Sequence, residues 1–193
     1  MKLIIASNNK HKVYEIKQIL GGRFEQILSL SEAGVIHEII EDGKTFMENA
    51  LKKAREIAEI TGCAALADDS GLCVNALDGA PGIYSARYAG EGSADLRDKA
   101  NNALLLKNLQ GKTDRSAHFC CAVALVYPDG REVKAEGYMM GKITLEPAGV
   151  SGFGYDPIFL PDGYDHTVAE MSDEEKNSIS HRGNALNILL TKI

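Results

Sequence analysis

The sequence predicts an α/β protein in which helices cover the faces of one mixed β-sheet. Three observations predict it. Residues 2–6 are nearly all apolar, which is typical of a strand buried on both faces. Apolar residues at helical spacing recur in several later segments. Residues 116–131 predict two strands joined by a Pro-Asp-Gly turn. With 193 residues, the chain is long enough for one sizeable core or for two small lobes that share a hinge.

Composition and charge exclude several classes of protein. The chain has 21 Lys and Arg against 27 Asp and Glu, a formal net charge of -6, which argues against a partner held mainly through nucleic-acid phosphates. No apolar run approaches 18 residues and the first is too short for a signal peptide, so we expect a soluble cytoplasmic protein without a membrane partner. Four cysteines without C-x-x-C spacing predict buried reduced thiols: Cys63, Cys73, Cys120 and Cys121.

The first half of the chain predicts strands that alternate with helices. A helix follows the first strand and ends at Gly21-Gly22. A second helix spans residues 45–61, with Thr45 and Glu48 as a capping box and Gly62 as its end. Short apolar runs predict two more strands, residues 64–67 and 72–77, separated by Asp-Asp-Ser-Gly.

The second half predicts a long ordered loop, a helix, the strand pair and a C-terminal helix. The loop covers residues 79–92, and Ser93 begins the helix after it. Residues 149–155 form a second loop, rich in glycine and aromatic residues. The buried stripe of the helix after Ser93 is predicted to comprise Leu96, Ala100, Ala103, Leu104 and Leu109, and that of the C-terminal helix Ala185, Ile188 and Leu189.

The loop between the first strand and the first helix is a candidate anion site. Backbone N–H groups at a helix N-terminus, polar side chains and two lysines can converge there on a phosphate. An ordinary helix cap is the alternative interpretation, since the loop does not carry the G-x-x-x-x-G-K-[ST] pattern. Lys52 and Lys53 can add charge, or can simply lie on a solvated helix face. The loop consists of Ser7, Asn8, Asn9, Lys10, His11 and Lys12.

Two adjacent carboxylates, Asp68 and Asp69, follow the strand over residues 64–67. Successive strand residues point to opposite faces, so we expect Asp68 to face away from Asp69. Mg²⁺ bound to a triphosphate takes one or two protein carboxylates, phosphate oxygens and water. The second carboxylate would come from Glu38, Glu41 or Asp42. An Asp-rich turn is the alternative.

Aromatic and basic residues near the C-terminus are candidates for base recognition. Phe153 and Tyr155 lie among glycines, which let backbone approach a ring while an aromatic side chain stacks on it. The alternative is that both rings belong to the core. His181 and Arg182 precede the last helix, and Arg182 either pairs with a carboxylate or donates hydrogen bonds to an oxygen of the base.

Taken together, these segments resemble the inosine/xanthosine triphosphate pyrophosphatase family. Their joint occurrence, from one end of the chain to the other, is highly specific. One departure is Ser151, where the family pattern has glycine. The matching motifs are [ST]-x-N-x-x-K at Ser7 to Lys12, E-D-G-x-T-F-x-E-N-A at Glu41 to Ala50, A-D-D-S-G-L at Ala67 to Leu72, P-G-x-Y-S-A-R at Pro81 to Arg87, F-G-Y-D-P at Phe153 to Pro157, and S-H-R-G at Ser180 to Gly183.

The resemblance implies an elongated mixed sheet with two lobes around a central cleft, formed by one domain over residues 1–193. It also implies a homodimer and a divalent metal, Mg²⁺. In this family, the loop from Ser7 to Lys12 and Lys53 would hold phosphates, and Glu41 and Asp69 would serve the metal. Asp69 would also accept the proton of the attacking water. The remaining nucleotide contacts would be Ser70, Phe153, Gly154, Tyr155, Asp156, Lys176, His181 and Arg182.

The implied reaction converts a non-standard purine nucleoside triphosphate (inosine, deoxyinosine or xanthosine triphosphate) and water into the monophosphate and pyrophosphate. Water would attack the α-phosphorus, with pyrophosphate as the leaving group. Two alternatives stay open: a pyrophosphatase for modified pyrimidine or methylated nucleotides, and a nucleotide-binding sensor without turnover.

Overall fold

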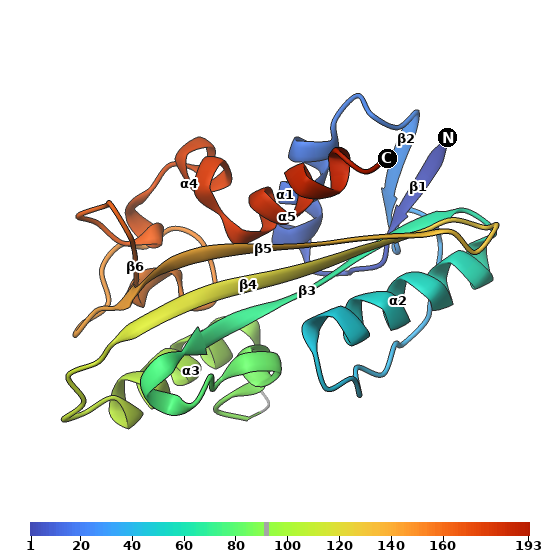
Figure 1. Cartoon of the computed structure of the whole chain (residues 1–193). Coiled ribbons are helices and arrows are strands. Elements are labelled where there is room, and N and C mark those ends of the chain that lie inside the picture. Colours follow the sequence, from blue (N-terminus) through green and yellow to red (C-terminus); the bar gives the residue numbers. More distant parts are fainter. Residues whose placement is uncertain (91–92) are drawn as a thin grey trace. The chain divides into compact units, whose positions relative to one another are not determined.

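The structure, a computed structural model, describes residues 1–90 and 93–193, which form two compact units (Figure 1). Unit 1 comprises residues 1–69, 121–137 and 181–193, and unit 2 comprises residues 70–120 and 138–180. Unit 1 contains two clusters of buried apolar side chains and unit 2 contains one. Whether residues 1–193 act as one domain stays a prediction.

The strands form a six-stranded mixed sheet in the order β2-β1-β3-β4-β5-β6. β1 pairs in parallel with β2 and β3, and β5 pairs antiparallel with β6, which confirms the predicted α/β class with a mixed sheet. β3, β4 and β5 contribute residues to both units. The elements are β1 Lys2–Ile5, α1 Lys10–Leu20, β2 Gln26–Ser29, α2 Phe46–Thr61, β3 Ala64–Val74, α3 Ala94–Asn108, β4 Ser116–Val126, β5 Glu132–Ile143, β6 Phe159–Pro161, α4 Asp173–Ile179 and α5 His181–Leu190.

Strand alternation divides the core of unit 1 into two layers. On β1, Leu3 and Ile5 pack in the cluster that includes residues of α1 and α5. Ile4, between them, packs in the cluster that includes residues of α2. Figure 1 shows α2 on one side of the unit 1 strands, with α1 and α5 on the other. The two-faced burial predicted for residues 2–6 is therefore confirmed.

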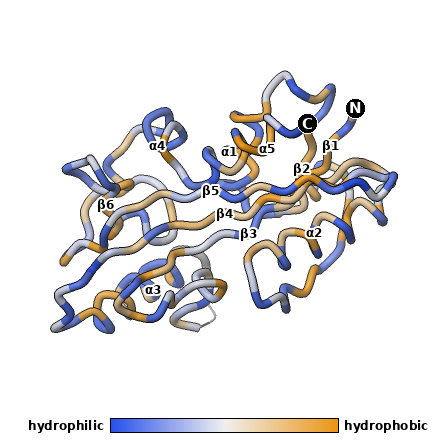
Figure 2. The backbone as a smooth tube through the Cα atoms, viewed as in Figure 1, coloured by the Kyte–Doolittle hydropathy of each residue, from blue (hydrophilic) through white to orange (hydrophobic). Residues whose placement is uncertain are grey.

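α2 begins and ends where its sequence predicts. The Thr45 side chain accepts a hydrogen bond from the Glu48 N–H, and Gly62 takes the left-handed conformation at the C-terminal end. The predicted capping box is half correct, because the Glu48 carboxylate binds the N–H of Lys44 rather than that of Thr45. Figure 2 shows hydrophobic and hydrophilic stretches alternating along this helix, as an amphipathic face requires.

One correction concerns residues 64–77. Two strands separated by a turn were expected, but β3 runs without interruption from Ala64 to Val74 and a short 3₁₀ helix follows over Asn75–Leu77. Asp-Asp-Ser-Gly is extended, so the interpretation as an Asp-rich turn is wrong. Pairing in the sheet outweighs the local turn preference, because β3 lies between β1 and β4.

A second correction concerns the buried face of α3. The helix begins at Ala94 as expected, but Leu96 is 69% exposed and Ala100 and Ala103 are also exposed. Leu109 is buried as predicted, but the buried face carries polar residues as well as leucines: Asn101, Asn102, Leu105 and Leu109. Because Asn101 and Asn102 are polar, apolar periodicity does not indicate that this face is buried.

The other elements agree with the sequence in most respects. The Tyr127 N–H donates a hydrogen bond of 2.9 Å to the Arg131 carbonyl across the predicted turn between β4 and β5. The loop predicted over residues 79–92 contains a 3₁₀ helix at Gly82–Arg87, and its residues 91 and 92 lie outside the described part. On α5, Ala185 and Leu189 are buried but Ile188 is 42% exposed.

Burial of the cysteines agrees with the prediction for Cys120 and Cys121, which are buried, whereas Cys63 and Cys73 are only half-buried. Within residues 1–90 and 93–193, every helix is too short or too polar to cross a bilayer.

Candidate active site

In unit 1, Asp68 and Asp69 point to opposite faces of β3, as strand alternation predicts. Asp68 meets residues of α1 and α5: its Oδ2 lies 3.1 Å from Lys12 Nζ and accepts hydrogen bonds of 3.1 Å from Nε and Nη2 of Arg182. Asp69 meets α2: its Oδ2 accepts a hydrogen bond of 2.9 Å from Asn49, and its Oδ1 lies 4.0 Å from Lys53 Nζ. The two carboxylates therefore have different partners.

The Asp68 side is a buried ion network. Arg182 is 1% exposed, and its Nη1 donates to Glu15, a buried carboxylate on α1. Burial alone would raise the pKa of Asp68, but the positive charges of Lys12 and Arg182 outweigh it and hold the pKa far below the usual aspartate range. Asp68 is therefore a fixed negative charge that anchors two cations.

The Asp69 side has different electrostatics. Burial raises the pKa of Asp69, and the charges of Lys53 and Lys12 offset that effect only in part. For Lys53, burial works to lower the pKa, but attraction to Asp69, Asp68 and Glu41 outweighs it and raises the pKa. A carboxylate whose pKa is raised is a stronger base than an ordinary aspartate, which suits acceptance of a proton.

The loop from Ser7 to Lys12 does cap its helix. Asn9 Oδ1 accepts hydrogen bonds from the N–H groups of His11 and Lys12, at 3.0 and 3.2 Å, and Ser7 Oγ accepts one from Asn9. The N–H groups of His11 and Lys12 are therefore engaged by Asn9, which matches the alternative of an ordinary helix cap, and phosphate binding by this loop stays a prediction. The loop still presents two lysines, of which Lys10 is exposed and Lys12 is half-buried.

The carboxylates around Lys53 fit a hard divalent cation. Glu41 Oε1 lies 2.6 Å from Lys53 Nζ, and Asp69 approaches the same ammonium, so oxygen ligands of the kind that Mg²⁺ prefers share one location. Among the described residues, no group of three His, Cys, Asp or Glu forms a ready metal cage. A cation there would need phosphate oxygens and water to complete its ligands, as Mg²⁺ on a triphosphate does.

In unit 2, the glycine-aromatic loop is built around Asp156, which is 5% exposed. Its Oδ2 accepts hydrogen bonds of 2.9 Å from the Phe153 N–H and from Lys176 Nζ. That ammonium also lies 4.5 Å from the centre of the Phe153 ring. Gly152 has φ +77°, and a Cβ there would meet Asp156 Oδ2 at 2.1 Å, so only glycine fits.

The remaining predicted site residues divide between the units. Ser70 and Tyr155 belong to unit 2, where Tyr155 is buried and donates a hydrogen bond of 2.9 Å to the Ser85 carbonyl. His181 and Arg182 belong to unit 1 and are both buried. Of the two roles considered for Arg182, its described hydrogen bonds match pairing with carboxylates; contact with a base stays a prediction.

Sequence reasoning missed two members of the unit 1 site, Glu15 and Asn49. Each lies three or four residues along a helix from a lysine that was singled out, Glu15 from Lys12 and Asn49 from Lys53. Residues at this spacing share a helix face, so the signal was present in the sequence.

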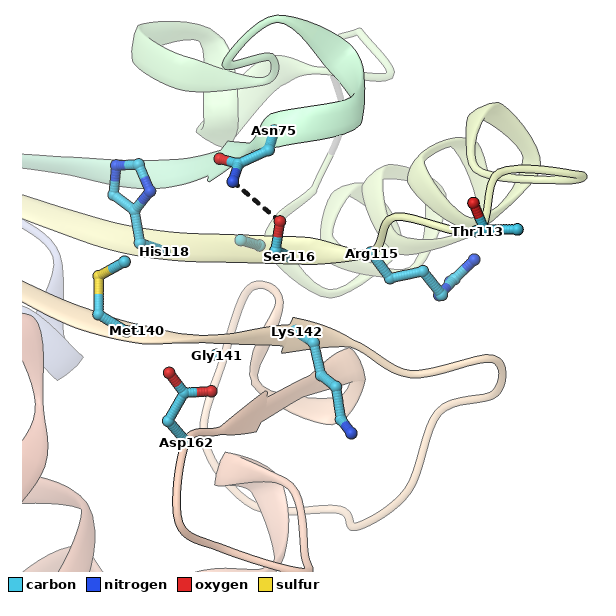
Figure 3. A pocket seen from close by; sticks show the side chains of 10 residues that line it. Asn75, Thr113, Arg115, Ser116, His118, Met140, Gly141, Lys142 and Asp162 are labelled. Carbon is cyan, nitrogen blue, oxygen red and sulfur yellow. Dashed lines mark hydrogen bonds between the residues drawn. The ribbon is translucent and has the colours of Figure 1, made fainter.

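A cavity of about 400 Å³ in unit 2 contains none of the predicted site residues (Figure 3). His118 and Lys142 are among the residues that line it, and Asn75, another lining residue, donates a hydrogen bond to Ser116. Arg115 gives its hydrogen bonds to backbone carbonyls of Leu109, Ile143 and Thr144. The arginine of this cavity therefore has a structural role.

A family comparison agrees with this geometry. The sequence model described as the Ham1 family matches residues 3–192. The chain belongs to the Ham1 family. The fold of other Ham1 proteins is the same: the structure of the Ham1 protein from Staphylococcus aureus aligns with a TM-score of 0.89 at 41% identity, covering 100% of this chain and 97% of that one. A HAM1 protein from Coxiella burnetii aligns with a TM-score of 0.89 at 40% identity, covering 100% of both chains.

Two curated relatives of this Ham1 protein carry the same name. A protein of Desulfotalea psychrophila called dITP/XTP pyrophosphatase is 53% identical over 184 residues, covering 95% of this chain and 81% of that protein. One of Desulforamulus reducens with the same name is 52% identical, covering 96% of this chain and 92% of that protein.

Proposed function

We propose that this Ham1 protein hydrolyses non-standard purine nucleoside triphosphates, such as inosine and xanthosine triphosphates, to the monophosphate and pyrophosphate. The observation that carries the proposal is the buried Asp69, held by Asn49 beside Lys53, in a chain whose curated relatives are named dITP/XTP pyrophosphatases. Removal of such nucleotides would keep them out of the precursor pool.

Residues of unit 1 would handle the phosphates and the water. Asp69 would accept the proton of the water that attacks the α-phosphorus, a role supported by its raised pKa. Lys12 and Lys53 would offset the negative charge on the phosphate oxygens, and Asn49 would hold the Asp69 carboxylate in orientation. Positioning and electrostatic stabilisation suffice for such a displacement, without a covalent intermediate.

Mg²⁺ is the proposed cofactor. Glu41 and Asp69 would hold it, and when bound it supplies positive charge against the phosphate oxygens. Lys53, which lies 2.6 Å from Glu41 and 4.0 Å from Asp69, places a positive charge beside both carboxylates.

Residues of unit 2 would recognise the base. The Phe153 ring would stack on it, and the Asp156 carboxylate would accept a hydrogen bond from a protonated ring nitrogen of hypoxanthine or xanthine. The Lys176 ammonium, which contacts both Phe153 and Asp156, would fix their geometry. Adenine lacks the proton at that ring nitrogen and should be a poor substrate.

A homodimer is the proposed assembly, and the cytoplasm, where nucleotide precursors are used, is the proposed compartment. Sedimentation of the purified protein would test the first, because a particle with the mass of one chain at micromolar concentration would contradict it.

Release of pyrophosphate, measured across a panel of nucleotides with and without Mg²⁺, tests the proposed function. We expect inosine, deoxyinosine and xanthosine triphosphates to be hydrolysed in the presence of Mg²⁺, and ATP to be hydrolysed far more slowly. Preference for modified pyrimidine or methylated nucleotides would replace the proposed substrate class. Tight binding without pyrophosphate release would indicate a sensor.

A further inference from the structure

One helix of unit 2, α3, holds the backbone of the base-recognition loop. Asp98 Oδ2 accepts a hydrogen bond of 2.7 Å from the N–H of Gly154. Asn102 Nδ2 donates one of 3.1 Å to the carbonyl of the same glycine. Asp98 and Asn102 lie four residues apart and therefore on one face of the helix. Both polar backbone groups of Gly154 are thus held from one side.

Gly154 needs such support because it has no side chain of its own to pack. Its φ is +62°, and a Cβ built there would meet nothing within 4 Å. Glycine has the largest conformational freedom of any residue. Its neighbours have other anchors: the Phe153 N–H is bound by Asp156, and the Tyr155 hydroxyl donates to Ser85. With Asp98 and Asn102 on Gly154, each of these three consecutive loop residues is held by a hydrogen bond.

The buried side chain of Asn102 has one polar atom without a hydrogen-bond partner among the described residues. The residue is 8% exposed, and this atom is its Oδ1. The orientation of the amide is fixed by chemistry, because only Nδ2 can donate to the Gly154 carbonyl. A buried acceptor without a partner lowers stability, so the hydrogen bond to the loop is the contact that explains the residue.

We propose that Asp98 and Asn102 are positioning residues for base recognition, which fix the peptide groups of Gly154 so that Phe153 and Asp156 keep the geometry that selects the base. The inference rests on the proposed function and deepens it. It assigns a role to the polar face of α3, which apolar periodicity does not predict to be buried.

Binding and turnover by four variants test the inference. Asn102→Asp keeps the shape of the side chain but removes its donor, and Asn102→Ala removes the amide without adding charge. Asp98→Ala removes the acceptor, whereas Asp98→Asn keeps one. Four quantities are measured for each variant: the Kd for inosine monophosphate, which carries the base but no triphosphate; kcat and KM for inosine triphosphate; and the inhibition constant of inorganic tripolyphosphate, which carries no base.

We expect Asn102→Asp, Asn102→Ala and Asp98→Ala each to raise the Kd for inosine monophosphate and the KM for inosine triphosphate about tenfold. kcat and the inhibition constant of tripolyphosphate should stay within about twofold, and Asp98→Asn should have a small effect on all four quantities. Asn108→Ala is the matched control, since Asn108 lies exposed on the same helix and contacts Tyr88 instead of the loop.

Two results would overturn the inference. One is an unchanged Kd for inosine monophosphate in both alanine variants, or no binding of this compound by the wild-type protein. The other is an equal loss for inosine monophosphate and tripolyphosphate together with a lower Tm, which would assign α3 a merely structural role. A wild-type protein that binds inosine monophosphate but hydrolyses no triphosphate would contradict the proposed function alone.

Discussion

Unit 1 and unit 2 hold their candidate functional groups in different ways. In unit 1, charged side chains on regular elements pair with one another: Asp68 with Lys12 and Arg182, and Asp69 with Asn49 beside Lys53. In unit 2, the functional element is a loop, and side chains anchor its backbone. Phosphates are alike in every nucleotide and require fixed charge, whereas a base is recognised by shape and hydrogen-bond direction. We therefore expect changes at the residues of unit 1 proposed to handle phosphate and water, Lys12, Lys53 and Asp69, to affect all triphosphates equally, and changes in the loop of unit 2 to alter the choice between bases.

The largest effect is expected from Arg182→Ala. It would leave Asp68 and Glu15 as buried carboxylates without their arginine, and breaking a buried ion pair in this way costs about 3–5 kcal/mol of unfolding free energy. Urea unfolding followed by circular dichroism measures it. Arg55→Ala is the control in the same unit: Arg55 is exposed and pairs with Glu132, so its loss should cost less than about 1 kcal/mol. Equal losses of unfolding free energy in the two variants would show that the buried ion pairs of Arg182 stabilise the protein no more than the exposed pair of Arg55 does.

Asp69→Asn should have the second largest effect. The amide keeps the size of the side chain but loses its charge and its basicity, so kcat for inosine triphosphate should fall by a factor of about 10² or more while the fold stays intact. Pyrophosphate release at saturating Mg²⁺ measures the effect, with Asp162→Asn, an exposed residue of unit 2, as the control. Turnover near that of the wild type would remove Asp69 from the mechanism.

Lys12→Ala and Lys53→Ala should have smaller effects that do not depend on the base. Each variant would lose a charge-assisted contact to phosphate, which corresponds to about 1.5–3 kcal/mol in kcat/KM. Parallel kinetics with inosine triphosphate, xanthosine triphosphate and ATP measure it. Lys10→Ala provides a comparison, because Lys10 is exposed in the same loop. If both variants keep wild-type kinetics, the phosphates bind elsewhere.

Two glycine variants test whether the loop of unit 2 must hold the Asp156 carboxylate in its present position. Gly152→Ala would bring a methyl group to 2.1 Å from Asp156 Oδ2, whereas Gly154→Ala meets nothing within 4 Å and suffers only from its positive φ. We expect Gly152→Ala to raise the KM for inosine triphosphate about tenfold, and Gly154→Ala to raise it less. A larger effect from Gly154→Ala would mean that the carboxylate of Asp156 does not need its present position.

The sequence predicts where Asp68, Asp69 and Lys53 of unit 1 lie, because their placement follows from regular periodicity. Alternation along β3 separates Asp68 from Asp69, and the cap at Thr45 places Lys53 on α2. The site in unit 2 is harder to predict, because it depends on contacts between segments far apart in the chain, such as Asp98 with Gly154. Polar residues on a buried helix face carry no signal in apolar periodicity.

The same reason explains one error. Asp-Asp-Ser-Gly is a typical turn sequence, but in the middle of a paired strand it is extended. For Arg182, the sequence leaves open whether the side chain pairs with a carboxylate or contacts a base; its described partners, Glu15 and Asp68, come from distant segments and match the first role, and base contact stays a prediction. Local preferences are overridden where distant segments supply partners, and functional sites are where this is most frequent.

The division of roles between the two units is tested most directly by the ratio of kcat/KM for inosine triphosphate to kcat/KM for ATP, measured in Lys53→Ala and in Gly152→Ala. We expect Lys53→Ala to lower both constants and to leave the ratio within about twofold of the wild type, and Gly152→Ala to lower the ratio about tenfold. A ratio that changes more in Lys53→Ala than in Gly152→Ala would contradict this division of roles.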